Sequence, residues 1–258
     1  MDLKSAHTGH IYRIFISVPE TPAPAAGHPV LYALDGNASF PTVALMARTI
    51  ARRSKATGQN APIVVGIGYA SGEDYDSTAR TRDYTPAAGE KSVHGEGGAD
   101  HFLDFIENTL KPLVRTVAPI DPQRQALFGH SYGGLLTLHA LFTRPAAFQT
   151  YIAASPSIWY ADQYLLSEVS NLAAPRKDEA KVLITVGELE QAAAPPSARS
   201  AALAKRRMVD QARDLAAQLD ANRDGFRLER VRFIELPHEN HGSAMFPALS
   251  RGLEFFLG

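Results

Sequence analysis

The sequence predicts an α/β fold, in which helices cover both faces of a mostly parallel central sheet. Apolar, β-branched segments alternate along the chain with segments of helical periodicity, a pattern typical of parallel strands that are connected by helices. The 258 residues show no internal repeat and no domain linker. We therefore expect residues 1–258 to form a single domain, since this length suits one large α/β unit.

The first part of the chain is expected to supply three strands and a helix. Residues 11–18 alternate with the period of a strand, and residues 63–69 are apolar throughout, as in a strand buried on both faces. The apolar run 30–34 predicts a further strand, and the Pro- and Ala-rich residues 19–29 predict a loop before it. Residues 40–53 have helical periodicity.

Residues 70–98 have a different character. They show little periodicity, contain many Gly, Ser, Asp and Arg residues, and follow directly on a predicted strand. A loop of this length in a compact domain is usually functional or disordered. We expect a substrate-facing loop here, and a mobile insertion is the alternative.

The rest of the chain continues the alternation. Pro112 interrupts the helical pattern of residues 100–117. Beyond it, the pattern predicts a strand at 124–128, a helix at 134–142, strands at 148–154 and 181–186, a long amphipathic helix at 197–222, a strand at 227–236 and a C-terminal helix.

A short turn joins the strand 124–128 to the helix 134–142. Its sequence, GHSYG at residues 129–133, fits the G-x-S-x-G nucleophile elbow in the strand–turn–helix context that this motif requires. The small residues let strand and helix approach closely, and the strained turn projects the serine hydroxyl outward. The turn therefore predicts an α/β-hydrolase fold with Ser131 as the nucleophile.

In an α/β-hydrolase an acid and then a histidine follow the serine, at the ends of later strands. His241, in the polar loop after the last strand, is the expected base, and His238 is the alternative. Glu190 and Glu188 both follow the preceding strand. We prefer Glu190 because the acid of this fold sits a few residues past the strand end. Asp162 is a further candidate.

Two other histidines lie near the elbow. His130 is expected to point away from the site as a structural residue, and His139 to pack on the helix behind the serine. The H-E-x-x-H zinc signature is absent from the sequence. Neither a metal nor an organic cofactor is expected, because a serine–histidine mechanism needs none.

Backbone N–H groups must hold the oxyanion that forms during acyl transfer. One is expected from Tyr132, the residue after the nucleophile, and the second from Asn37 or Gly36, after an earlier strand. Taken alone, the Asp35-Gly36-Asn37 segment is also a simple turn.

Three further side chains are candidates for substrate binding. Trp159 follows a strand end and is either part of the core or a wall for a flat aromatic group. Arg80 and Arg82, in the segment 70–98, either clamp an anionic or catechol-like substrate or are solvated loop residues.

Composition excludes several classes of protein. With 26 basic and 27 acidic residues the net charge is near zero, which argues against nucleic acid as a partner. The chain contains no cysteine, so disulfides and a cysteine nucleophile are excluded. No apolar run spans a membrane and no signal peptide is visible. We expect a soluble protein, cytoplasmic as the chain stands and periplasmic if a signal peptide was removed.

Taken together, these segments resemble the esterase D-like esterases. The likeness runs from about residue 10 to the C-terminus. Its motifs are YRIFISVP at 12–19, LDGN at 34–37, RDYTP at 82–86, GGAD at 97–100, GHSYGG at 129–134, ASPS at 154–157, VGELE at 186–190 and HGS at 241–243. Within that family the chain is most similar to the esterases of trilactone siderophores, namely enterobactin, salmochelin and bacillibactin.

This resemblance implies hydrolysis of a cyclic triester of serine or threonine that bears catechol groups, and release of its iron. It implies Ser131 as nucleophile and His241 as base. Some members work as a Ser–His dyad, so the acid is the residue that the resemblance fixes least. The alternatives are a feruloyl or acetyl esterase and, in another class, a catalytically silent binding protein on the same fold.

Overall fold

The computed structural model describes residues 1–92, 95–173, 179–191 and 204–258. In this part of the chain an eight-stranded sheet runs in the order β1-β2-β4-β3-β5-β6-β7-β8. The strands are β1 (Asp2–Lys4), β2 (Ile11–Ser17), β3 (His28–Leu34), β4 (Ile63–Tyr69), β5 (Ile120–His130), β6 (Thr150–Ala154), β7 (Ala180–Gly187) and β8 (Leu228–Leu236).

The sheet is parallel from β4 through β8, and only β1 and β2 are antiparallel to their neighbours. The predicted fold class is therefore confirmed. The three-residue strand β1 was not predicted from the sequence, because it is too short to show a periodicity.

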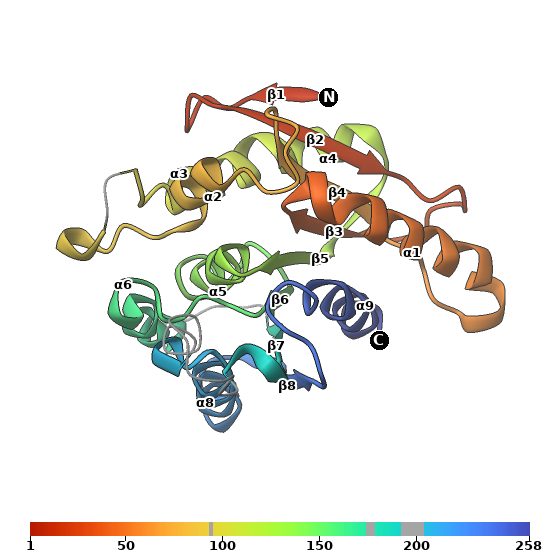
Figure 1. Ribbon diagram of the computed structural model, residues 1–258. Helices are drawn as coiled ribbons and strands as arrows, with labels where there is room; N and C mark the ends of the chain where they lie inside the picture. Colours follow the sequence, from red (N-terminus) through yellow and green to blue (C-terminus); the bar gives the residue numbers. More distant parts are fainter. Residues whose placement is uncertain (93–94, 174–178, 192–203) are drawn as a thin grey trace.

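Helices cover both faces of the sheet, as Figure 1 shows. One face carries α1 (Gly36–Thr57) and α9 (Met245–Leu257), which enclose the smaller apolar cluster. The other face carries α3 (Ala99–Phe105), α4 (Lys111–Val117), α5 (Tyr132–Thr143) and α8 (Met208–Ala221) over the larger cluster. Successive residues of β5 alternate between the two clusters, with Leu127 in the larger and Phe128 in the smaller.

The segment 70–98 is not the structureless loop that its composition predicted. It contains the helix α2 (Ser77–Tyr84) and the short 3-10 turn η1 (Gly89–Lys91). The side chain of Asp76 accepts a hydrogen bond of 2.9 Å from the N–H of Ala79 and so caps the start of α2. The helix has no apolar periodicity because it is anchored mainly through polar side chains.

Two helices begin or continue differently from the prediction. The helix predicted over 100–117 is continuous, because the π-helical segment Ile106–Leu110 joins α3 to α4 and Pro112 falls in the first turn of α4. The helix predicted over 197–222 is interrupted at Arg207, which is left-handed with φ of 45°; residues 204–206 are helical, and α8 begins at Met208. Residues 197–203 of that prediction lie outside the described residues.

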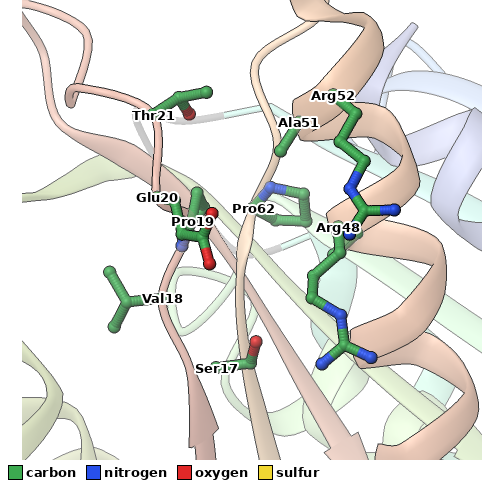
Figure 2. Close-up of a pocket in the computed structure, with 10 residues that line it drawn as sticks. Ser17, Val18, Pro19, Glu20, Thr21, Arg48, Ala51, Arg52 and Pro62 are labelled. Atoms are coloured by element: carbon green, nitrogen blue, oxygen red, sulfur yellow. The ribbon is translucent and has the colours of Figure 1, made fainter.

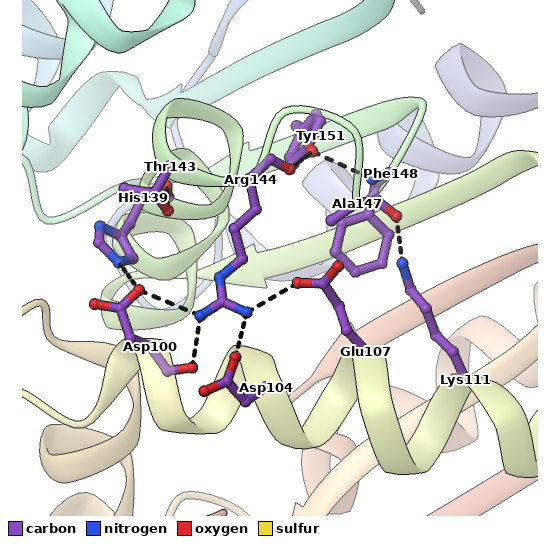
Figure 3. A network of polar contacts seen from close by, with 10 residues as sticks. All are labelled: Asp100, Asp104, Glu107, Lys111, His139, Thr143, Arg144, Ala147, Phe148 and Tyr151. Atoms are coloured by element: carbon purple, nitrogen blue, oxygen red, sulfur yellow. Dashed lines mark hydrogen bonds and ion pairs between the residues drawn. The ribbon is translucent and has the colours of Figure 1, made fainter. Parts of the chain in front are cut away.

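An ionic network that is buried at His139 and partly exposed elsewhere fastens α5, the helix after the elbow, to its neighbours (Figure 3). His139 is 2% exposed, and its Nδ1 lies 2.8 Å from Glu168 Oε2 while Nε2 lies 3.4 Å from Asp100 Oδ1. Arg144, one turn further along, pairs with Asp104 at 2.6 Å and Glu107 at 3.0 Å. The sequence predicted only packing for His139, and the structure gives it an electrostatic role.

The His139 pair makes stability depend on pH. Burial lowers the pKa of His139, but its hydrogen bonds to Asp100 and Glu168 outweigh burial and raise the pKa to about 9. Because this folded-state pKa lies above the unfolded value near 6.5, the stabilisation is complete below about pH 6.5 and is lost as the pH rises towards 9.

We expect the free energy of unfolding to fall by about 3 kcal/mol between pH 6.5 and 9, and most of this slope to disappear in His139→Gln. Urea unfolding at a series of pH values measures both. The exposed His101→Gln serves as a control that keeps the slope. If the unfolding free energy of His139→Gln depended on pH as steeply as that of the parent, His139 would not be the cause of the pH dependence.

Candidate active site

Several predicted site residues gather at the carboxyl edge of the parallel sheet, where sites of open α/β sheets form. Gly36 follows β3, Ser131 follows β5, Glu190 follows β7 and His241 follows β8. The strand order places β5, β6, β7 and β8 side by side. Residues that are 110 positions apart in the chain therefore meet in space.

Ser131 lies in a strained turn between β5 and α5. Its φ of 61° and ψ of −117° belong to a region that favours glycine. The turn is tight, since a Cβ on Gly134 would lie 2.8 Å from the Ala154 carbonyl oxygen. The Ser131 N–H donates to that same oxygen at 2.9 Å. The close approach expected of the elbow is thus present, and it points the serine hydroxyl out of the sheet.

The structure brings Ser131, His241 and Glu190 together in one hydrogen-bonded chain. Ser131 Oγ lies 3.0 Å from His241 Nε2, and His241 Nδ1 lies 2.6 Å from Glu190 Oε2. The His241 side chain is 40% exposed, whereas that of Glu190 is fully buried. A base is therefore in reach of the hydroxyl proton, and a carboxylate fixes the tautomer of that base.

Glu190 remains a carboxylate despite its burial. Burial raises its pKa, but hydrogen bonds from His241, Ser155 and the Gly187 N–H outweigh burial and lower the pKa. Ser155 Oγ donates to Glu190 Oε1 at 2.5 Å, and the Gly187 N–H donates to the same oxygen at 2.7 Å. A buried charge with this many donors is well suited to hold an imidazolium.

The alternatives Glu188, His238 and Asp162 form contacts outside the chain of Ser131, His241 and Glu190. Glu188 Oε2 accepts a hydrogen bond of 2.7 Å from the backbone N–H of His238, whose side chain is 93% exposed. Asp162 is 86% exposed and lies 3.7 Å from Lys91. The sequence left the two glutamates open, and the side-chain directions in the turn Glu188–Glu190 separate them.

The loop that carries His241 is shaped by its own side chains. Asn240 Oδ1 accepts hydrogen bonds from the N–H groups of Gly242 and Ser243, at 2.9 and 3.2 Å. The ring of His130 lies 4.8 Å from that of His241, so His130 does not point away as the sequence suggested. Burial lowers the pKa of His130 to about 3, and this ring therefore packs beside His241 without a charge.

The Ser155-Pro156-Ser157 turn is a part of the site that residue-level reasoning did not assign. Ser155 holds Glu190, and Ser157 Oγ lies 3.5 Å from Ser131 Oγ. Ser155 is left-handed with φ of 43°. The signals of this turn in the sequence were its place directly after a strand and the ASPS motif at 154–157, which gave no role to the single serines.

The predicted oxyanion donors lie at the starts of two helices. Tyr132 is the first residue of α5, and Gly36 and Asn37 are the first two residues of α1. The first N–H groups of a helix have no partner within it and favour an anion. The Asn37 side chain accepts from the Tyr69 N–H at 2.9 Å and donates to its carbonyl at 3.2 Å. It thereby fixes α1 against the end of β4.

Arg80 links these two helix starts. Its guanidinium binds both carboxylate oxygens of Asp35 at 2.6 and 3.1 Å, and it also donates to the His130 carbonyl at 3.3 Å. Asp35 and His130 immediately precede Gly36 and Ser131 in the chain. Arg80 therefore holds the two sets of predicted oxyanion donors in a fixed relation.

Both predicted substrate-binding arginines pair with carboxylates of the protein. The Arg80 side chain is 12% exposed and is used within the protein. Arg82 binds the buried Asp83 in a fork of 2.7 and 2.8 Å. Both side chains neutralise carboxylates of the protein, a pairing that neither alternative, the substrate clamp or the solvated loop residue, had included.

We expect Arg80→Met to lower the free energy of unfolding by about 3–5 kcal/mol, since it leaves the buried Asp35 carboxylate without its partner. Arg13→Met is a matched control, because Arg13 forms the same forked pair with Asp2 on the surface. Its loss of stability should be far smaller. Urea unfolding of both variants provides the measurement. If both variants lost the same free energy of unfolding, burial of the pair of Arg80 with Asp35 would have no effect on stability.

Trp159 lies at the edge of the site and is partly buried. Its ring centroid is 6.1 Å from that of Tyr132, and the guanidinium of Arg206 lies 4.3 Å from its ring. It thus packs against the core and contacts the residue after the serine, while its role as a wall for an aromatic group stays a prediction.

Other features of the described residues lie apart from this site. A hollow of about 180 Å³ (Figure 2) lies between Pro62, Arg48 and Ser17, at the start of β4 and hence at the opposite edge of the parallel strands. Within the described ranges no group of three or more metal-ligating side chains is found. No described helix has the length and apolarity that crossing a membrane requires.

The doubly covered sheet and the elbow after β5 define an α/β-hydrolase, with His241 and Glu190 at the later strand ends. Within that class the chain belongs to an esterase family, because the family model described as "Putative esterase" matches residues 5–227. The family resemblance of the sequence motifs is therefore confirmed.

Relatives of known activity match most of the chain. The ferri-bacillibactin esterase BesA of Bacillus subtilis is 39% identical over 268 residues, which cover 99% of this chain and 88% of that protein. The siderophore triacetylfusarinine C esterase of Aspergillus fumigatus is 41% identical over 245 residues, which cover 89% of this chain and 81% of that protein. The crystal structure of the BES protein from Bacillus cereus is 36% identical, with a TM-score of 0.87 over 100% of this chain and 95% of that one.

Proposed function

We propose that this protein is a serine esterase that cleaves the ester bonds of a trilactone siderophore, a ferric catecholate of the enterobactin type, and so releases its iron. The observation that carries the reaction type is the unbroken chain from Ser131 through His241 to Glu190, with distances of 3.0 and 2.6 Å. The substrate class is supported by the two relatives, whose names give siderophores as their substrates.

The reaction begins with attack of Ser131 Oγ on the ester carbonyl carbon, while His241 Nε2 takes the hydroxyl proton. The oxyanion that develops accepts hydrogen bonds from the N–H groups of Tyr132 and of Gly36 or Asn37. Collapse of this tetrahedral intermediate expels the alcohol, which takes the proton back from His241. An acyl group is then attached to Ser131.

Water completes the cycle. His241 removes a proton from the water as it attacks the acyl group, and Ser131 leaves with that proton. Glu190 keeps His241 in the tautomer that accepts protons at Nε2 and stabilises the imidazolium that forms twice in each turnover. Iron enters and leaves with the substrate.

The proposal is tested by comparing ferric enterobactin with methyl ferulate as substrates. We expect a higher kcat/KM for the siderophore, with linear fragments of the triester identified by mass spectrometry. Faster hydrolysis of methyl ferulate would indicate a feruloyl-type carboxylesterase. Absence of turnover on both esters, and on p-nitrophenyl acetate, would indicate a binding protein.

A further inference from the structure

A second hollow, of about 390 Å³, lies beside Trp159 at the edge of the site. Its lining consists of Trp159, Asp162, Gln163, Lys205, Arg206 and Gln211. Trp159 stands two residues after Ser157, whose hydroxyl lies 3.5 Å from Ser131 Oγ. Its ring also lies 6.1 Å from that of Tyr132, the residue after the serine. A molecule bound covalently at Ser131 could therefore extend one arm into this hollow.

The hollow combines an aromatic wall with two cations. The guanidinium of Arg206 lies 4.3 Å from the Trp159 ring centroid, a contact that holds this charge at the hollow. Lys205 lines the hollow beside it. Among the described residues of the lining, the only acid is Asp162, which is exposed and lies 3.7 Å from Lys91. The positive charge of Lys91 offsets the negative charge of this carboxylate. The walls thus favour a ligand that is flat and anionic.

A buried polar atom at the same place has no hydrogen-bond partner among the described residues. Gln211 is 8% exposed, and none of the described residues supplies a hydrogen bond to its Oε1. Buried side-chain amides are almost always hydrogen-bonded, and an exception calls for an explanation. A donor on a ligand in the hollow would satisfy this oxygen.

The backbone that forms one wall is strained. Ala161, Asp162 and Gln163 are left-handed in succession, with φ of 46°, 54° and 65°. Each such residue costs about 1 kcal/mol or more, and this kind of strain clusters at ligand-binding sites. The turn displays Asp162 and Gln163 at the hollow directly after Trp159 and Tyr160.

We propose that this hollow is a subsite for an aromatic anion, one catecholate ring of the substrate. The ring lies against Trp159, its deprotonated oxygens accept hydrogen bonds from Arg206 and Lys205, and the amide N–H that joins ring to triester donates to Gln211 Oε1. Binding of iron displaces the catechol protons, so the subsite selects the ferric form over the iron-free form. This inference rests on the proposed function for its ligand.

The first test is kinetic. In Arg206→Gln the ratio of kcat/KM for ferric to iron-free enterobactin should fall about tenfold, the effect of one lost charge-assisted hydrogen bond. Arg207→Gln is the matched control, since Arg207 is the next residue but pairs with Asp210 at 3.3 Å. It should keep the parental ratio. Equal losses for both forms of the substrate in Arg206→Gln would overturn the subsite.

The second test does not depend on hydrolysis. Trp159 is the only tryptophan of the chain, so its fluorescence reports binding at the subsite directly. In a Ser131→Ala background, 2,3-dihydroxybenzoate should quench it saturably, about tenfold more weakly in Arg206→Gln, and neutral benzamide should not. Absence of saturable quenching refutes the subsite. Quenching without any hydrolysis of enterobactin by the parent leaves the subsite standing and refutes the proposed substrate.

Discussion

Replacement of Ser131 by alanine is expected to lower kcat for ester hydrolysis by roughly four to six orders of magnitude, because nucleophile and base act as one unit. The parent enzyme, treated with a fluorophosphonate, should carry the adduct on Ser131 when the labelled peptide is mapped by mass spectrometry. The alanine variant should carry none.

A glycine variant at the same position is a control for Ser131→Ala. Because Ser131 occupies a φ of 61°, Ser131→Gly should be inactive and yet about 1 kcal/mol more stable than the parent. An inactive and destabilised glycine variant would show that the loss of activity came from unfolding. An adduct on another serine would remove Ser131 from the mechanism.

Replacement of Glu190 by glutamine is the second large expected effect. The neutral amide keeps the size of the side chain but loses the charge that orients and stabilises His241, so kcat should fall by about two to four orders of magnitude. Glu188→Gln is the control, since Glu188 contacts His238 and not His241. It should remain within about threefold of the parent, as expected for an exposed substitution.

The two glutamine variants also decide between a triad and a dyad. If Glu190→Gln retained nearly full activity, Ser131 and His241 would work without an acid. If Glu188→Gln were the impaired variant, the hydrogen bond of 2.6 Å between His241 and Glu190 would have no catalytic meaning. Steady-state kinetics on p-nitrophenyl acetate is sufficient for both variants.

Much of the site could be predicted because it obeys a local rule. Ser131, Glu190 and His241 each follow a strand, and parallel strands end at one edge of a sheet. The apolar pattern that reveals the strands therefore also reveals where these side chains lie. The strand Ile63–Tyr69 was predicted with its exact bounds because all of its residues are buried.

Other features leave no such pattern. The pair of Arg80 with Asp35 joins residues 45 positions apart, and α2 is stabilised by such polar contacts in place of an apolar face. The same holds for the hydrogen bond from Ser155 to Glu190. The periodicity of apolar residues indicates which residues face the core. It does not indicate which polar side chains form a pair.

The Arg80 bridge has a consequence for how the enzyme can change. Because it ties the starts of α1 and α5 together from α2, we expect the predicted oxyanion donors to be preorganised before any ester arrives and to need no reorientation during the reaction. Among the described residues, 85–92 form no hydrogen bond with the Arg80 guanidinium. Sequence variation in this stretch should therefore leave the Arg80 bridge and the reaction centre intact, and we propose residues 85–92 as the target for directed evolution of new substrate preferences.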